Sequence, residues 1–230
     1  MNELLEAFRH TFEGKIYKHR VANLGDRIAG FLYDDLYSLG HSHKLVQRID
    51  EPSEVVNTRN RITGKEGRRG DGTFGQLIPG TESRVVKPYN VRRGPVATLR
   101  IGTEVKILNT KKLAQIDRVM SDLKTQAETF RRQTRTAITV GIAGVNFADE
   151  YTNYEGKRRF PARYPPTRDA EETVDRLHRL ARPAFDELLI LRFRATNRRP
   201  FPFEWVDEKE VLMQYGSVLV RISNEYEERF

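Results

Sequence analysis

The pattern of hydrophobic and polar positions predicts helices and strands most clearly in the middle of the chain. Val96–Leu108 has the alternation of a strand, with one face formed by Leu99, Ile101, Val105 and Ile107. Lys111–Arg132 carries its apolar residues at helical spacing, and Ala137–Phe147 is a mostly apolar run of strand length. Strand, helix and buried strand with short connections form a βαβ unit, so we expect parallel strands and a right-handed crossover.

Similar patterns flank this unit. Residues 18–39 predict an amphipathic helix, and Asp169–Arg182 followed by Glu187–Ala195 predicts a second helix and strand. Turn residues crowd residues 50–95, where short strands at Phe74–Ile78 and Arg84–Tyr89 are expected on either side of a Pro-Gly turn. The periodicity of Glu210–Arg229 does not decide between helix and strand.

These elements predict an α/β fold with a mixed central sheet flanked by helices. A chain of 230 residues fits one domain, with a core at about 18–147 and a C-terminal elaboration, 148–230, packed on it.

Chemistry enters at the end of the strand that precedes the central helix. Side chains alternate along a strand, so Glu104 and Lys106 share one face while Val105 and Ile107 share the other. The apolar face is expected to pack on the helix that follows, which leaves the acid and the amine facing a cleft, a second layer or water. An E-x-K tripeptide is common, and a solvated ion pair is its ordinary explanation.

The net charge of +8 is concentrated rather than spread. Between Asn57 and Arg100 there are ten basic residues against three acidic ones, which is most of the excess. Charge gathered in one loop-rich region indicates a polyanionic partner.

The chain contains no cysteine, so disulfides, thiolate nucleophiles and cysteine-ligated zinc are excluded. Its five histidines are scattered except for the pair around Ser42, which is expected to be exposed. Carboxylates and carbonyls are therefore the available metal ligands, and they favour Mg²⁺ or Mn²⁺. With no secretory signal and no apolar run long enough for a bilayer, we expect a cytoplasmic protein without membrane contact.

At this point the chain resembles the PD-(D/E)XK restriction-endonuclease-like superfamily. Those proteins have a leading helix, three strands, a crossover helix and a further strand, with one acid on a strand and a (D/E)-x-K tripeptide on the next. The corresponding segments here are Lys18–Leu39, Glu104-Val105-Lys106, Lys111–Arg132 and Ala137–Phe147. The resemblance covers about the middle two-thirds of the chain and implies a restriction-endonuclease-like core with loop insertions.

The resemblance implies that Asp71 and Glu104 are catalytic metal ligands, with the carbonyl of Val105 as a further ligand and Lys106 positioning the attacking water. Asp71 lies 33 residues before Glu104, which requires Ser83–Arg93 to loop out. Glu82 is the competing upstream acid, and an ordinary Asp-Gly turn is the other explanation of Asp71. The leading helix could add an acid, from Asp26, Asp34 or Asp35.

The function expected is a Mg²⁺-dependent endodeoxyribonuclease, for which restriction or phage defence is one role. The stretch between Asn57 and Arg100, which we call the basic window, would bind the phosphates of DNA, and double-stranded DNA is favoured. The residues expected to do so are Arg59, Arg61, Arg68, Arg69, Arg92 and Arg93. Two other classes stay open: a non-catalytic nucleic-acid-binding module, and an enzyme acting on a phosphorylated small molecule. Cutting both strands favours a homodimer, and activation by a partner is the alternative. Asn197–Trp205 mixes cations with aromatics, which suits base stacking or, more simply, a proline-locked loop.

Overall fold

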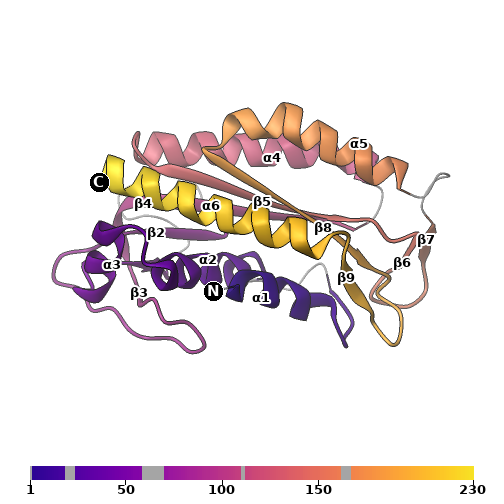
Figure 1. Ribbon diagram of the computed structural model, residues 1–230, viewed down its shortest axis with the longest axis horizontal. Helices are drawn as coiled ribbons and strands as arrows, with labels where there is room; N and C mark the ends of the chain where they lie inside the picture. The colour runs from indigo at the N-terminus through magenta and orange to yellow at the C-terminus, as the bar shows by residue number, and fades with distance from the viewer. Residues whose placement is uncertain (1, 19–23, 59–69, 110–111, 162–166) are drawn as a thin grey trace.

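The computed structural model describes residues 2–18, 24–58, 70–109, 112–161 and 167–230. As predicted, the fold is α/β, with a mixed seven-stranded sheet between two layers of helices (Figure 1). In spatial order the strands are β3 (Arg93–Gly94), β1 (Glu54–Asn57), β2 (Gly72–Leu77), β4 (Val96–Leu108), β5 (Ile138–Asn146), β8 (Glu187–Ala195) and β9 (Phe203–Trp205). A separate hairpin is formed by β6 (Glu150–Thr152) and β7 (Arg159–Pro161).

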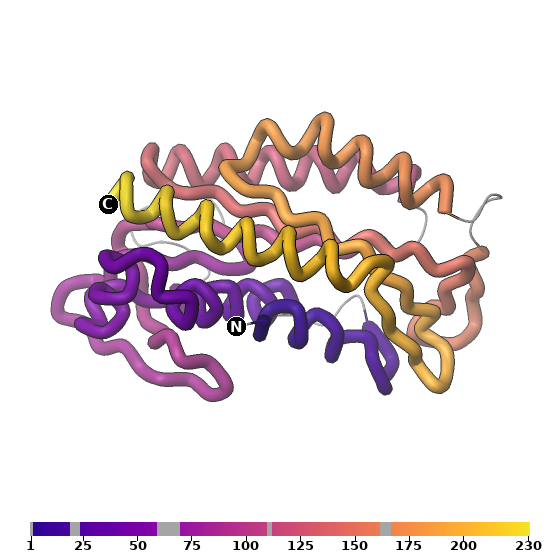
Figure 2. Tube along the Cα trace, in the orientation of Figure 1, coloured from indigo at the N-terminus to yellow at the C-terminus, as the bar shows by residue number. Residues whose placement is uncertain are grey.

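Each face of the sheet has its own hydrophobic core. One core joins the sheet to α1 (Glu3–Phe12), α2 (Leu24–Leu39), α3 (His43–Asp50) and α6 (Glu208–Arg229). The other joins it to α4 (Lys112–Gln133) and to α5 (Arg168–Arg176), which continues into the π-helical segment Leu177–Ala181 and the 3₁₀ turn Arg182–Ala184. In Figure 2, α4 and α5 run side by side above the sheet and the other four helices lie on its opposite side.

The two βαβ units are confirmed. β4 and β5 are parallel, with Glu104 opposite Gly141, and α4 connects them. β5 and β8 are also parallel, and α5 precedes β8 on the same side of the sheet as α4. The C-terminal segment that the periodicity left undecided is the single helix α6.

The strand predicted at Arg84–Tyr89 is wrong. This segment makes one isolated bridge, between Arg84 and Arg93, and it loops out between β2 and β4. Val85 is half exposed and Tyr89 is the one buried side chain of the segment, so no alternating buried face holds it in the sheet, and Pro88 lacks an N–H for a ladder. β2 itself starts earlier than predicted, at Gly72.

The prediction that four apolar residues of β4 share one face is wrong for Leu99. The β2–β4 register shifts between Phe74, which pairs with Ile101, and Gly75, which pairs with Leu99, so Arg100 is an extra residue in β4. Leu99 therefore packs with Phe130 of α4, whereas Ile101 packs in the opposite core.

The expectation that the Val105 face packs on the following helix is also wrong. Val105 belongs to the core under α1, α2 and α6. Gly102 lies against Phe130 of α4. Side chains alternate along a strand, so Glu104 and Lys106 are on the same face as Gly102 and point to the α4 side.

Among the described residues, no helix combines the length and the apolar character that crossing a membrane requires.

Candidate active site

Asp71 lies directly before β2, at the end of the sheet where β4 runs toward α4. Its N–H donates to the carbonyl of Thr103 at 3.1 Å, and its Oδ2 accepts from the N–H of Val105 at 2.7 Å. Since Gly72 is opposite Thr103 in this antiparallel pair, Asp71 stands opposite Glu104 and on the same face. Two acids that are 33 residues apart in sequence are thus brought together.

Two glycines allow the close packing around Asp71 and the residue before it. A Cβ on Gly25, in the first turn of α2, would stand 2.2 Å from the carboxyl carbon of Asp71. Gly70 has a φ of +73°, and a Cβ there would meet the Phe130 ring at 2.5 Å and the Thr103 carbonyl at 2.9 Å. The start of α2 therefore touches the carboxylate itself, and side chains larger than hydrogen are excluded at both positions.

Glu104 is 7% exposed, and its Oε1 accepts from the Nζ of Lys106 at 2.5 Å. Burial, joined by the negative charge of Asp71, raises the pKa of Glu104 to about 7, against the opposing effect of Lys106. Burial alone would lower the pKa of Lys106, but the charges of Glu104, Asp71 and Asp122 raise it instead. The site is therefore a carboxylate pair with an ammonium group beside it, in which one carboxyl takes up a proton close to neutral pH.

The two acids of α2 that sequence offered as further ligands are structural, so these two suggestions are wrong. Asp34 accepts from the backbone N–H groups of Asn90 and Val91. Asp35 accepts from the first N–H groups of α1 and from the hydroxyl of Tyr215 at 2.6 Å. Asp26 is different, because it adjoins Gly25 and so lies in the turn that touches Asp71.

The remaining upstream acid, Glu82, is exposed in the loop between β2 and β3. Nothing brings it to the pair, and Asp71 is the acid that stands opposite Glu104.

Two of the six predicted phosphate-binding arginines lie in the described part of the chain. Arg92 donates to the hydroxyl and carbonyl of Ser83, and the Arg93 guanidinium lies 3.8 Å from the centre of the Tyr89 ring. Both contacts hold the loop before β3, which β1 and β2 separate from β4. The other four, Arg59, Arg61, Arg68 and Arg69, lie outside the described residues.

The donor set suits a hard divalent cation. Asp71 and Glu104 offer carboxylate oxygens, and the carbonyl of Val105 points toward the β2 side of the strand, as its N–H does. Within the described residues no cluster of three or more His, Cys, Asp or Glu is placed to hold a metal. Mg²⁺ is commonly bound by one or two carboxylates and keeps several of its waters, so the pair meets that requirement.

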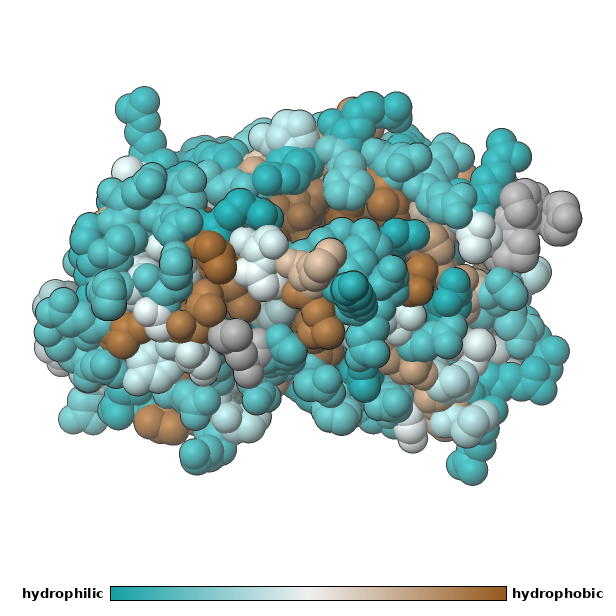
Figure 3. All heavy atoms as spheres, in the orientation of Figure 1, coloured by the Kyte–Doolittle hydropathy of each residue, from teal (hydrophilic) through white to brown (hydrophobic). Residues whose placement is uncertain are grey.

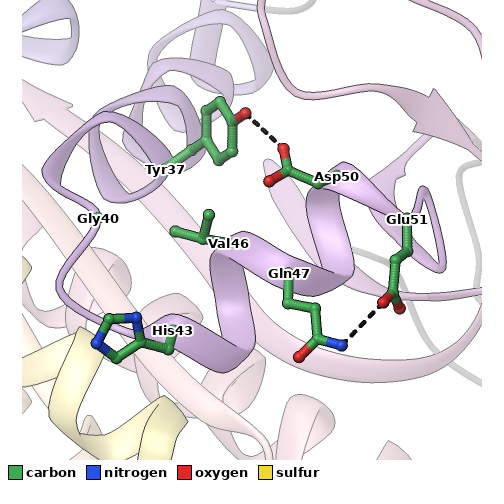
Figure 4. Close-up of a pocket in the computed structure, with 7 residues that line it drawn as sticks. All are labelled: Tyr37, Gly40, His43, Val46, Gln47, Asp50 and Glu51. Atoms are coloured by element: carbon green, nitrogen blue, oxygen red, sulfur yellow. Dashed lines mark hydrogen bonds between the residues drawn. The ribbon is translucent and has the colours of Figure 1, made fainter.

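Two hollows in the described surface lie away from the carboxylate pair. One of about 640 Å³ is formed by residues of α2 and α3, where Tyr37 donates to Asp50 and Gln47 to Glu51 (Figure 4). His43 lies at its rim, and His41 bonds Asn224 on α6, so this histidine pair is separate from the carboxylates. A second hollow, of about 450 Å³, lies beside β9. Neither contains a residue of the carboxylate pair.

Comparisons with known proteins identify no relative: no protein-family model matches the chain, and no curated protein or solved structure gives a significant match.

Proposed function

We propose that this protein is a Mg²⁺-dependent endonuclease that hydrolyses phosphodiester bonds of DNA. One observation carries the proposal: Asp71 stands opposite Glu104 across β2 and β4, with Lys106 on the same face at 2.5 Å from Glu104. Two carboxylates and an ammonium group can supply what phosphodiester hydrolysis requires, because negative charge develops on the phosphate oxygens and a water must be activated.

The order of elements supports the proposal. A leading helix, α2, is followed by the antiparallel strands β1, β2 and β4, then by the crossover helix α4 and the parallel strand β5. This order resembles that of a restriction-endonuclease-like core and supports the proposal to that extent. The insertion between β2 and β4 contains β3 and accounts for the long spacing between the two acids.

The residues of the chain divide the chemistry between them. Asp71 is fixed by the N–H of Val105, so its carboxylate has one orientation and serves to position a ligand. Glu104 offers the second carboxylate of the pair, and as a metal ligand it would act in its ionised form. The Lys106 ammonium orients the attacking water and stabilises charge developing on the phosphate oxygens. A divalent cation bound by the two carboxylates would supply a Lewis acid.

The direct test is cleavage of supercoiled plasmid DNA in Mg²⁺ and in EDTA. We expect cleavage in Mg²⁺ alone, and its loss in Lys106→Ala with DNA binding retained. The matched control is Lys124→Ala, which removes an exposed lysine from α4 and should cleave like the native protein. Full cleavage by Glu104→Ala would refute the assignment.

The same assay distinguishes the other classes of function. DNA binding that weakens with salt, without cleavage under any metal, would indicate a binding module in which Glu104 and Lys106 are only an ion pair. Stabilisation by nucleotides in a thermal-shift panel, without DNA binding, would indicate an enzyme of phosphorylated small molecules. For an enzyme that cuts both strands we propose a homodimer, which sedimentation of the pure protein checks, and a phage plating assay tests a defence role.

A further inference from the structure

Three segments that are distant in sequence meet around Asn197, in the loop between β8 and β9. The Asn197 side chain accepts from the N–H of Tyr17 at 2.7 Å, and donates to the carbonyls of Tyr17 at 3.2 Å and Thr152 at 2.9 Å. It is 6% exposed and has a φ of +55°, a conformation that asparagine tolerates better than most residues. The N–H of Thr152 also donates to the carbonyl of Thr196. These bonds fix the β6–β7 hairpin and the segment after α1 against the β8–β9 loop.

The surface of this junction is rich in positive charge. Residues 13–18, 150–161 and 196–201 contain seven basic residues against three acidic ones, and we call them the Asn197 surface. All seven cations are exposed: Lys15, Lys18, Lys157, Arg158, Arg159, Arg198 and Arg199. Within the described part of the chain, Arg198 is the one that makes an ion pair, at 3.5 Å from Glu150. The junction lies at the right end of Figure 1, and the same end of the space-filling view is predominantly hydrophilic (Figure 3).

The seven exposed cations of the Asn197 surface are not needed for folding. Apart from the Arg198–Glu150 ion pair, the side chains that hold the junction together are uncharged, namely Asn197, the buried Tyr17 and Tyr151, and the Phe12 ring stacked at 4.6 Å on Tyr17. Like charges held close together repel one another, so the arrangement favours an anionic partner that neutralises them. Within this surface the aromatic side chains of Phe160 and Phe201 are partly buried, which favours contacts with phosphates over stacking on bases.

The surface lies at the same end of the sheet as the carboxylate pair. β4, β5 and β8 are parallel, and the β6–β7 hairpin and the β8–β9 loop follow the carboxyl ends of β5 and β8. Glu104 is opposite Gly141, and β5 ends five residues later at Asn146, a distance of roughly 17 Å at about 3.3 Å per residue. A duplex rises about 3.4 Å per base pair, so DNA at Glu104 would reach the surface after about five or more base pairs.

We propose that the Asn197 surface binds the phosphodiester backbone of DNA on one flank of the cleavage site. The inference rests on the proposed endonuclease function for its substrate. It extends the DNA contact to a part of the chain remote from the basic window at residues 57–100. The contact is with phosphates, so it adds affinity and orientation without reading base sequence.

The test measures DNA binding separately from cleavage. The native protein and a variant with three reversed charges are titrated into a fluorescent 30-base-pair duplex in EDTA at several salt concentrations. The variant is Lys157→Glu, Arg158→Glu and Arg199→Glu, which spares Arg198 and its ion pair. A matched control reverses three exposed cations on or near the α4 and α5 layer: Lys124→Glu, Arg135→Glu and Arg179→Glu.

We expect the Asn197-surface variant to bind at least about tenfold more weakly at 100 mM salt. The slope of log Kd against log salt should also fall by about 2 to 3, because each lost phosphate contact removes about 0.9. The control should lose much less affinity, and both variants should unfold at the native urea midpoint. Native affinity and an unchanged slope in the surface variant would overturn the inference. The inference would also be overturned if the variant bound DNA as the native protein does but bound anionic lipid vesicles more weakly. That result would assign the surface to a membrane instead.

Failure of this inference can be distinguished from failure of the proposed function. If the native protein cleaves DNA and the surface variant binds normally, the endonuclease stands and the Asn197 surface does not. If no metal supports cleavage while the variant loses affinity, the surface stands and the protein binds DNA without cutting it.

Discussion

Replacing Glu104 by glutamine tests whether the carboxylate pair is built as described. The substitution keeps the size of the side chain and removes its charge. We expect the metal-free variant to gain stability relative to the native protein as pH rises from 4.5 to 8. The reason is that Glu104 binds a proton in the folded protein at pH values where the unfolded chain has already released it.

The size and sign follow from the two pKa values. Burial and the neighbouring Asp71 raise the pKa of Glu104 from 4.5 in the unfolded chain to about 7 in the folded protein. Between these values the folded state binds more protons, so the native free energy of unfolding falls with rising pH and the full loss is present above pH 7. A difference of 2.5 pH units corresponds to about 3 kcal/mol, shared by the interacting pair. Glutamine does not titrate, so the variant does not lose this free energy of unfolding as pH rises. Effects of the substitution on the Lys106 contact that do not depend on pH cancel when the difference between variant and native protein is compared between pH values.

The assay is urea unfolding in EDTA at pH 4.5, 6, 7 and 8, with the slope against denaturant held common at each pH. The control is Glu128→Gln, an exposed acid on α4, for which no comparable dependence is expected. Adding Mg²⁺ at pH 8 should stabilise the native protein and leave Glu104→Gln nearly unchanged, since ligands stabilise the state that binds them. A difference between variant and native protein that stays constant within about 0.5 kcal/mol from pH 4.5 to 8 would show that Glu104 is not buried beside Asp71.

Three further substitutions test the frame around the pair. Gly25→Ala places a methyl group where the Asp71 carboxyl lies, so we expect plasmid cleavage to be lost with nearly native circular dichroism. Native activity would argue against that contact. Asp35→Ala removes the acceptor of two α1 N–H groups and of Tyr215, and should cost about 3 kcal/mol in urea unfolding; a loss below 1 kcal/mol would contradict its capping role. Glu54→Ala leaves two arginines and a buried tyrosine without their shared carboxylate and should cost about 3–5 kcal/mol, whereas a neutral result in the same assay would refute this network.

What the sequence predicts well is what local periodicity determines. The predicted boundaries of β4, α4, β5 and β8 agree with the structure to within a residue or two, since each element buries a face of its own. β3 and the looped-out segment around Val85 depend on pairing with a distant strand, and no local pattern specifies that. The shift at Arg100 has the same origin, because a bulge is a property of two strands together.

The candidate site shows the same division. The Glu104 tripeptide can be recognised from the sequence because it interrupts an apolar strand. Asp71, in its Asp-Gly turn, can be recognised only as one of several candidate acids. The importance of Gly25 cannot be predicted from the sequence, because it depends on how closely α2 approaches Asp71 at the start of β2. The structural role of Asp35 could have been inferred: it falls on the buried stripe of α2, four residues after Phe31 and next to Leu36. An acid on an apolar stripe indicates a buried partner.

The way each buried acid is satisfied separates structural carboxylates from the candidate catalytic ones. Asp34 and Asp35 are held by backbone N–H groups and by Tyr215, and Glu54 is held by Arg48, Arg100 and Tyr226. Their environments supply donors, which is what stabilises a buried acid.

Asp71 and Glu104 depart from that rule in degree, because the negative charge of Asp71 is second only to burial among the causes that raise the pKa of Glu104. Desolvation and like charge then act in the same direction on Glu104, and the contact with Lys106 only partly offsets them. A fold selected for stability alone would replace one acid of such a pair by an amide, as Glu104→Gln does. Retaining both acids is explained if a cation binds between them and offsets the repulsion between the two carboxylates. The pH-dependent instability predicted for the metal-free protein and its relief by Mg²⁺ are therefore two measurements of the same property.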